Sequence, residues 1–444
     1  MPTDSSSRDG DGVIGLLDAV AIEVGLIIGG ALFALVGVGV ALSGAGVIVA
    51  FGLAIFIAVL GLVPTAMLGA SFPTTCGHYR YPQRFVSSWL AFAAAWGLGI
   101  SMFTGGLPLY ALTAGEYLET LLPLSPTVTG VGFLTFFFVL NLLGIRPAAR
   151  AQLVMFLVLV GALASFILFG LPAVEKSNLT PLFEDNLVGI VAAAGILYFA
   201  CLGANFVIDI GGELRDATVT IPRSFLLSIP LVFALYVSVS TVAVGTVGVD
   251  TMAGETLMVP AERFLSAEFQ TLFVVGGAVF AVATSLNAAY ILVPRYARVL
   301  AEAGLFPAAL GRQNERFGTA HWALLGTYLL ASAMVFAPLP FEEMGALLGL
   351  GGAFVVTMVM VAAIAAIRDP PESFDPTAFP VPTQVVLSMA VLAVPLNLLL
   401  IVLLATQTSV LFVGWIGGVG LGLVYYSIRM NYYAAGDSSV EMRT

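Results

Sequence analysis

Long apolar stretches recur along the whole chain, and they constrain its fold more than any other feature. A helix needs about 20 mostly apolar residues to cross the hydrocarbon core of a bilayer. Such stretches lie near residues 14–36, 44–70, 87–113, 127–144, 151–171, 188–211, 225–248, 270–294, 321–338, 344–367, 383–405 and 409–428. The sequence therefore predicts an all-α, polytopic membrane protein with about twelve transmembrane helices.

The composition agrees with a lipid environment and excludes several classes of protein. Hydrophobic residues make up 59% of the chain and charged residues 9%, whereas a soluble domain is roughly a quarter charged. Two cysteines and two histidines are too few for a disulfide framework or a metal enzyme. The net charge of -10 argues against nucleic-acid binding, which needs a basic surface. The polar first thirteen residues, with Arg8 as their only basic residue, do not resemble a cleavable signal peptide.

The basic residues are almost all arginine. Fifteen are arginine and one is lysine, Lys176, against 26 acidic residues. An acidic surface that avoids lysine is typical of a salt-loving host, in which ions screen the self-repulsion of a high net charge. The alternative is that membrane proteins simply hold few lysines.

The positions of these basic residues predict the orientation of the chain. With both termini placed in the cytoplasm, only Lys176 and Arg263 fall in outer loops. The other fourteen fall inside: Arg8, Arg80, Arg84, Arg146, Arg150, Arg215, Arg223, Arg295, Arg298, Arg312, Arg316, Arg368, Arg429 and Arg443. This is the asymmetry of the positive-inside rule. This asymmetry favours an even number of spans, with both termini on the cytoplasmic side of the cell membrane.

Glycines interrupt two of the predicted spans. The first span contains Gly25, Gly29 and Gly30, and the sixth contains Gly203 within the run 201–205. Glycine in a spanning helix either permits close packing of helices or marks an unwound segment that binds a ligand. Because the two interruptions lie five spans apart, they favour an inverted repeat with a central binding site.

Several segments resemble the amino acid–polyamine–organocation superfamily of permeases. Residues 25–33 are similar to its Gly-x-Ile-Gly-Ser-Gly-Ile-Phe-like stretch, with Gly30 at the hydroxyl position and Ala31 at the last glycine. Residues 72–81 are similar to its Phe-Pro-x-x-Gly-Gly-x-Tyr-x-Tyr motif, with Cys76 in place of one glycine. Residues 198–223 and 298–319 also match the family, around its sixth helix and after its eighth. The resemblance covers spans one to nine.

The resemblance implies the leucine-transporter-like fold of five helices, five inverted helices and two more. The expected organisation is a cytoplasmic tail (1–13), a first repeat of spans 1–5 (14–180), a second repeat of spans 6–10 (181–370), spans 11 and 12 (371–428) and a second cytoplasmic tail (429–444). The implied activity is secondary active transport of an amino acid or a related amine by alternating access.

A zwitterionic substrate needs partners for both charges, because an unpaired buried charge is very unfavourable. Free amides at the start of a half-helix attract a carboxylate, and free carbonyls at the end of another attract an ammonium group. We expect the carboxylate at the amides of Gly29, Gly30 and Ala31. We expect the ammonium group at carbonyls near Ile27, Phe199, Ala200 and Leu202, with Gly203 and Ala204 completing the site. Family members often have an aromatic gate at the position of Ala204.

Two acidic residues within the spans are candidates for ion coupling. Glu23 lies less than one turn before Gly25, and Asp209 lies in the inner half of span six. An acidic residue inside the membrane is by default a functional candidate. Two neighbouring carboxyl groups would allow one proton to bind near neutral pH. The alternative is that Glu23 is solvated by a cytoplasmic vestibule.

Sodium coupling has its own candidate residues. The lysine that replaces sodium in some family members has no counterpart here, because Leu159 stands at the matching place. Thr284 and Ser285 match the hydroxyl ligands of sodium-coupled relatives, and the carbonyls of Gly25 and Ile28 would complete an oxygen site. The alternative is that both hydroxyls bond back to their own helix. Sodium coupling, proton coupling and uncoupled exchange stay open. No cofactor is expected, and sodium is the one candidate for a bound ion.

Three other functions compete with transport. A receptor-like homologue would bind the substrate without moving it, although the sequence shows no appended sensor domain. An intramembrane enzyme would need a nucleophile and a base in evident geometry, and a channel would need a charged ring or a carbonyl filter. The sequence favours a transporter and no enzyme activity, with a polyamine carrier or an uncoupled amino acid exchanger as the nearest alternatives.

Overall fold

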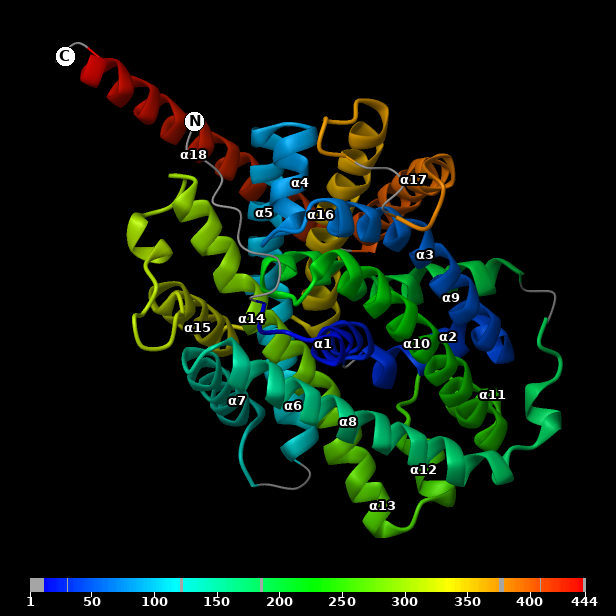
Figure 1. Ribbon diagram of the computed structural model, residues 1–444. Coiled ribbons are helices and arrows are strands. Elements are labelled where there is room, and N and C mark those ends of the chain that lie inside the picture. Colours follow the sequence, from blue (N-terminus) through cyan, green and yellow to red (C-terminus); the bar gives the residue numbers. More distant parts are fainter. Residues whose placement is uncertain are drawn as a thin grey trace.

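The computed structural model describes residues 12–29, 31–119, 123–183, 187–374, 379–407 and 409–441. Helices dominate this part of the chain, in which β-structure is limited to two isolated bridges. The short helix α4 (Gly77–Phe85) lies at one end of the bundle, and α12 (Met258–Phe264) and α13 (Ala267–Leu272) lie at the other (Figure 1). The prediction of an all-α fold is confirmed.

The helices that cross the bundle follow the predicted stretches in order. The first five spans are α1 (Leu16–Ile28) with α2 (Ala31–Ser43), α3 (Val47–Ser71), α5 (Ser88–Ser101) with α6 (Leu107–Glu119), α7 (Pro126–Leu142) and α8 (Ile145–Gly170). The next five are α9 (Leu187–Cys201) with η5 (Leu202–Asp209), α10 (Ala217–Val247), α13 with α14 (Phe280–Glu302), α15 (His321–Phe336) and α16 (Phe341–Arg368). The last two are α17 (Thr383–Gln407) and α18 (Ser409–Glu441).

Length and composition agree with a polytopic membrane protein. In the described part of the chain, nine helical segments are long and apolar enough to cross a membrane, and α7 and α15 are shorter apolar helices. One of the nine, Leu35–Ser71, runs from α2 into α3 and therefore belongs to two of the predicted spans. The division of the chain into two inverted repeats stays a prediction.

The first predicted interruption lies between α1 and α2. Gly29 ends α1 with a φ of 36° and a ψ of -158°, a conformation that residues with a side chain rarely adopt. The Ser285 hydroxyl lies 2.6 Å from the place where a Cβ of residue 29 would be. Both the backbone conformation and the close approach therefore require glycine.

The second interruption changes the type of helix. α9 ends at Cys201, and the chain continues as the 3₁₀-helix η5. A Cβ at Gly203 would lie 2.4 Å from the main-chain oxygen of Leu26. Gly203 therefore lets span six approach the backbone of α1 directly. The place where span six changes its type of helix is thus also a place of close helix packing.

Backbone hydrogen bonds tie together the end of the bundle that carries α4. The amide of Ile14 donates to Glu213 O (3.0 Å), and the amide of Arg215 donates to Ile14 O (2.9 Å). The amide of Cys76 donates to Asp209 O at 2.9 Å. The chain before α1 and the turn before α4 thus both pair with the segment that follows span six.

Candidate functional site

The broken first span occupies the centre of the bundle. α1 packs against α8, α10, α14 and η5, and Figure 1 shows it surrounded by α8, α10 and α14. Its residues from Ala19 to Gly25 are buried. Polar groups on the surrounding helices must therefore find partners on α1 or on one another.

The hydroxyls of Thr284 and Ser285 on α14 lie against the carbonyl of Gly25. Ser285 Oγ donates to Gly25 O at 2.8 Å, and Thr284 Oγ1 is 3.5 Å from the same oxygen. Thr284 Oγ1 lies closer, at 2.7 Å, to Ala281 O in its own helix. The hydroxyls thus contact α1 and their own helix together, and the sodium site stays a prediction. Ile28 is buried at the end of α1, and the described bonds of these hydroxyls go to Gly25 and Ala281.

The hydroxyl of Tyr236 on α10 also reaches the broken span. It donates to Ile27 O at 2.9 Å, and the Tyr236 side chain is buried. This carbonyl is one of those predicted to face a substrate ammonium group. The sequence analysis missed Tyr236, although a buried tyrosine hydroxyl usually has a hydrogen-bond partner.

A chain of three buried amide side chains connects α7, α14, α8 and α1. Asn141 Nδ2 donates to Asn287 Oδ1 at 3.0 Å, and Asn287 Nδ2 donates to Gln152 Oε1 at 2.8 Å. Gln152 Nε2 in turn donates to Ala21 O at 3.2 Å. These residues were also missed. Their signal in the sequence is the occurrence of three amides within predicted spans, where each must be hydrogen-bonded.

The side of the site formed by span six is apolar and close-packed. Ala200, Leu202 and Ala204 are buried, and Gly203 contacts the backbone of α1. Asn205 connects this face to α3, because its Nδ2 donates to Leu202 O at 3.2 Å and its Oδ1 accepts a hydrogen bond from Thr65 Oγ1 of α3 at 2.8 Å.

The structure thus brings the predicted substrate-binding residues of the two interruptions together. Three predicted positions fall wholly or partly outside the described residues: Gly30, the side chain of Ala31 and the side chain of Phe199.

Glu23 is completely buried between α1 and α10 and has one described partner. Ser224 Oγ lies 2.5 Å from Glu23 Oε1 and 2.9 Å from Ile221 O. The hydroxyl of Ser228, one turn further along α10, also faces this carboxyl group, but it lies beyond hydrogen-bond distance of Glu23 Oε2. A charged carboxylate with so few donors would be very unfavourable in this environment.

Asp209 has a different set of partners from Glu23. Its Oδ2 accepts hydrogen bonds from Tyr296 OH of α14 (2.6 Å) and from His78 Nδ1 of α4 (3.0 Å). Its Oδ1 accepts from the amide of His78 at 3.0 Å. The described contacts therefore bind the two carboxyl groups to separate clusters, whereas the sequence analysis considered that they could be neighbours.

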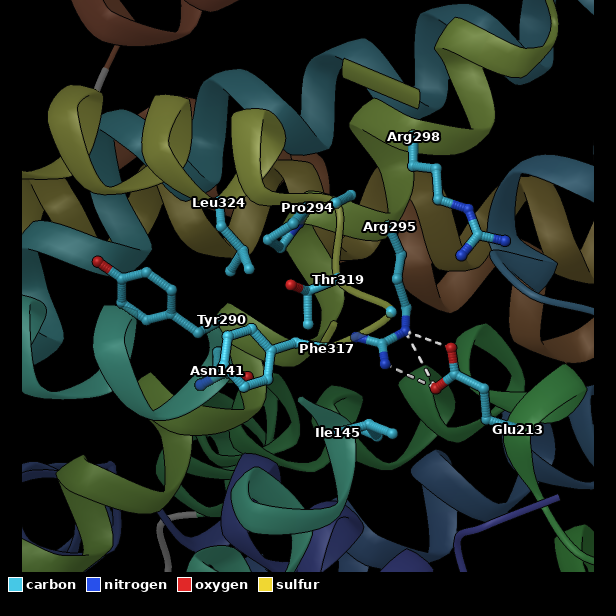
Figure 2. Close-up of a pocket in the computed structure, with 12 residues that line it drawn as sticks. Asn141, Ile145, Glu213, Tyr290, Pro294, Arg295, Arg298, Phe317, Thr319 and Leu324 are labelled. Carbon is cyan, nitrogen blue, oxygen red and sulfur yellow. Dashed lines mark hydrogen bonds and ion pairs between the residues drawn. The ribbon is translucent and has the colours of Figure 1, made fainter. Parts of the chain in front are cut away.

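A cavity of about 250 Å³ lies at the end of α14 that faces α4. Figure 2 shows Arg295 on its wall, directed toward Glu213 of the short 3₁₀-helix η6 (Gly211–Glu213). The guanidinium Nε and Nη2 both donate to the carboxylate, with Nη2 2.6 Å from Oε2. Asn141, the first member of the amide chain, also lines this cavity. The remaining lining residues are Ile145, Tyr290, Pro294, Arg298, Phe317, Gly318, Thr319, Ala320 and Leu324.

The chain is similar to known membrane transporters over most of its length. A family model described as an amino acid permease matches residues 14–428. The branched-chain amino acid permease BcaP of Bacillus subtilis is 25% identical over 447 aligned residues, which cover 93% of this chain and 92% of that protein. An uncharacterized transporter of Mycobacterium tuberculosis is 26% identical over 307 residues, covering 68% and 69%. The vacuolar cationic amino acid transporter 2 of Arabidopsis thaliana is 26% identical over 380 residues, covering 80% and 59%.

Proposed function

Because this chain belongs to the amino acid permease family, we propose that it is a secondary active transporter that moves neutral amino acids by alternating access. The observation that carries the proposal is the contact between the two interruptions. Gly203 of span six lies against the backbone of α1 next to the break at Gly29. Two helices that both change conformation at one buried place create main-chain groups that a ligand can use.

The main chain around the break supplies both partial charges that an amino acid needs. α1 ends at Ile28 and α2 begins at Ala31, so α2 offers free amides at its start and α1 offers free carbonyls at its end. We assign the substrate carboxylate to the amides of Gly29, Gly30 and Ala31. The ammonium group is assigned to carbonyls near Ile27 and in the segment 199–202. Tyr236 donates to Ile27 O and leaves one lone pair of that oxygen for the substrate.

The side-chain environment favours a neutral substrate over a cationic one. Ala200, Leu202 and Ala204 flank the interruption of span six and are buried. A cationic side chain would need a carboxylate partner in this environment. The carboxyl groups described within these spans, Glu23 and Asp209, are bound in their own clusters. BcaP, whose name gives branched-chain amino acids as its substrates, agrees with this assignment.

The geometry of Glu23 supports proton coupling. A serine hydroxyl has one hydrogen, yet Ser224 Oγ is within hydrogen-bond distance of two oxygens, Glu23 Oε1 and Ile221 O. The carbonyl of Ile221 can only accept. Two full hydrogen bonds form together when Ser224 donates to Ile221 O and a protonated Glu23 donates to Ser224 Oγ. The buried position of Glu23 therefore fits the neutral, proton-carrying form.

Sodium coupling has weaker support. The hydroxyls of Thr284 and Ser285 lie against carbonyls of Gly25 and Ala281, so the carbonyl that would bind Na⁺ accepts a hydrogen bond instead. A sodium ion would need both hydroxyls to turn their hydrogens away from α1. Sodium coupling is retained as the alternative that the experiment must exclude.

Two kinds of irregular helix recur five spans apart, which supports two related halves. Spans one and six are interrupted, and spans three and eight each contain a π-helical segment with a glycine pair, η2 (Met102–Gly106) and η7 (Phe273–Val279).

In our proposal one end of the substrate pathway is closed by the pairing of Ile14 with the segment 213–215 and by the Arg295–Glu213 ion pair. Positive-inside sorting assigns this end to the cytoplasm.

The proposal is tested by uptake into proteoliposomes that contain the purified protein. Labelled leucine, arginine and putrescine are offered in turn under an imposed proton gradient and then under an imposed sodium gradient. We expect leucine to accumulate with the proton gradient, and excess unlabelled leucine to compete where arginine does not. Counterflow without accumulation under either gradient would establish an uncoupled exchanger, and binding without counterflow would establish a receptor-like protein. Sodium-driven uptake that Thr284→Ala with Ser285→Ala abolishes would establish the sodium alternative.

A further inference from the structure

The cavity at the end of α14 has the size and the lining of a small-molecule site. Its volume of about 250 Å³ gives room for roughly eight non-hydrogen atoms, at about 30 Å³ per water molecule. That is the size of a small amino acid such as valine. Its lining combines a few polar and charged side chains with an apolar wall (Figure 2), formed by Ile145, Pro294, Phe317 and Leu324. Concave, largely apolar spaces with a few polar groups are the usual form of ligand sites.

Asn141 offers an unused hydrogen-bond acceptor at this cavity. Its side chain is 7% exposed, and its Nδ2 donates to Phe137 O at 2.9 Å and to Asn287 Oδ1 at 3.0 Å. No hydrogen bond in the described part of the chain reaches its Oδ1, which is therefore the polar atom left for a partner in the cavity. A nearly buried amide oxygen without a donor is unfavourable, so an N–H group in the cavity would stabilise it.

The amide chain that starts at Asn141 runs in one direction, toward the broken first span. Asn141 donates to Asn287, which donates to Gln152. Gln152 in turn donates to Ala21 O in α1. Because hydrogen bonds in a chain polarise one another, a donor to the Asn141 oxygen would strengthen the bonds that follow. A ligand in the cavity is thus connected to α1 through side chains that already lie in contact.

The charged groups of the cavity can receive both an ammonium group and a carboxylate. Arg295 and Glu213 form an ion pair, but Glu213 Oε1 accepts one described bond, from Arg295 Nε at 2.9 Å, and so keeps a lone pair. Arg298 follows Arg295 by three residues, on the same face of α14. Its described bond uses Nε alone, toward Glu302 Oε1 at 2.8 Å. The other two guanidinium nitrogens can therefore donate to an anionic group.

We propose that this cavity is a second amino acid-binding site, separate from the site at the broken helices. Asn141 Oδ1 and Glu213 Oε1 receive the ammonium group, Arg298 receives the carboxylate, and the apolar wall receives the side chain. A simple anion would leave the Asn141 oxygen without a donor, and a simple amine would gain nothing from Arg298. This site goes beyond the proposed function, which needs one substrate at the interruptions of spans one and six.

Ala320→Cys places a thiol on the wall of the cavity for a protection experiment. Ala320 lines the cavity and takes no part in the proposed contacts. The native Cys76 and Cys201 are buried, so the protein without the new thiol gives the background. The purified protein is labelled with a small methanethiosulfonate reagent at increasing concentrations of leucine. At ten times the half-protecting concentration we expect labelling to slow about tenfold, as mass action requires for one site.

Two fragments of leucine identify the groups that the cavity recognises. Isoamylamine lacks the carboxylate, and 4-methylpentanoate lacks the ammonium group. Each fragment should need a concentration at least about tenfold higher than leucine for the same protection, because each loses hydrogen bonds to a charged group.

Three substitutions in the Ala320→Cys protein separate this site from other effects of leucine. Arg298→Gln should raise the half-protecting concentration of leucine about tenfold. Glu302→Gln is the matched control, because it removes the exposed partner of Arg298 and should leave that concentration unchanged or lower. Gly203→Ala alters the contact between the two interruptions, and leucine should still protect the new thiol.

Absence of protection by leucine, equal protection by 4-methylpentanoate, or an unchanged half-protecting concentration in Arg298→Gln would each overturn the second site. Loss of protection in Gly203→Ala would show that the thiol reports on the central site, and it would also overturn the proposal. The labelling does not depend on transport. Protection in a protein that moves no amino acid would therefore refute the proposed function and leave the second site standing.

Discussion

The Gly203→Ala substitution places a methyl group against main-chain atoms of the broken first span. The new carbon would lie 2.4 Å from Leu26 O, 2.6 Å from Leu26 C and 3.0 Å from Ile27 N. Ordinary contact begins near 3.4 Å, so α1 and η5 must separate by about 1 Å at this point. Backbone atoms cannot rotate away as the end of a flexible side chain would.

This separation affects both the stability of the protein and its rate of transport. Overpacking a close-packed interior by one carbon typically costs about 1–3 kcal/mol, which would lower the melting temperature of the purified protein. A displacement of about 1 Å in groups that must meet in one geometry can reduce a rate on the order of 100-fold. We therefore expect leucine uptake by Gly203→Ala to fall far more than its stability does.

Gly326→Ala in α15 is the matched control. Nothing lies within 4 Å of the position that its Cβ would occupy, so we expect normal uptake and a melting temperature that is unchanged or higher. Normal uptake and normal stability in Gly203→Ala would refute the close approach of the two interruptions. Lower stability with normal uptake would support the close packing at Gly203, but it would show that the two interruptions are not part of the transport pathway.

Three further outcomes follow from single contacts. Tyr236→Phe removes the donor to Ile27 O and should raise the KM for leucine while stability falls by about 1 kcal/mol, measured by uptake kinetics and thermal unfolding. Asn287→Leu leaves Gln152 Oε1 without its described donor and should lower the free energy of unfolding by about 1–3 kcal/mol; an unchanged melting curve would contradict the amide chain. Burial raises the pKa of Cys76, so its thiol stabilises the fold at neutral pH and this contribution declines as pH rises above about 8.5, where the unfolded thiol ionises. The melting temperature should therefore fall less steeply between pH 8 and pH 10 in Cys76→Ala than in the parent; equal slopes would refute the linkage.

The sequence alone predicted the spans and both interruptions. Hydropathy determines where helices cross a bilayer because the energetic requirement is local to about 20 residues. Glycine was informative at two positions for different reasons. At position 29 the backbone has a conformation that other residues rarely adopt, and at position 203 the backbone of α1 leaves no room for a side chain. The hydroxyls of Thr284 and Ser285 could be placed near Gly25 only through the resemblance to a known family.

The polar clusters could not be predicted, because each joins spans far apart in the sequence. Asn141, Gln152 and Asn287 hydrogen-bond across three helices, and nothing local to any one of them indicates its partner. The contact of His78 with Asp209 likewise exists only because the turn before α4 pairs with the end of η5. The pairing of such groups depends on the tertiary arrangement, which periodicity and composition do not determine.

Glu23 provides the most direct test of the account, because it is the predicted carrier of the coupled proton. Glu23→Gln keeps the size of the side chain and a donor toward Ser224, and it removes the ability to bind and release a proton. We expect this variant to exchange labelled leucine for unlabelled leucine at a rate near that of the parent, and to lose accumulation driven by an imposed proton gradient. Undiminished proton-driven accumulation by Glu23→Gln would contradict the account.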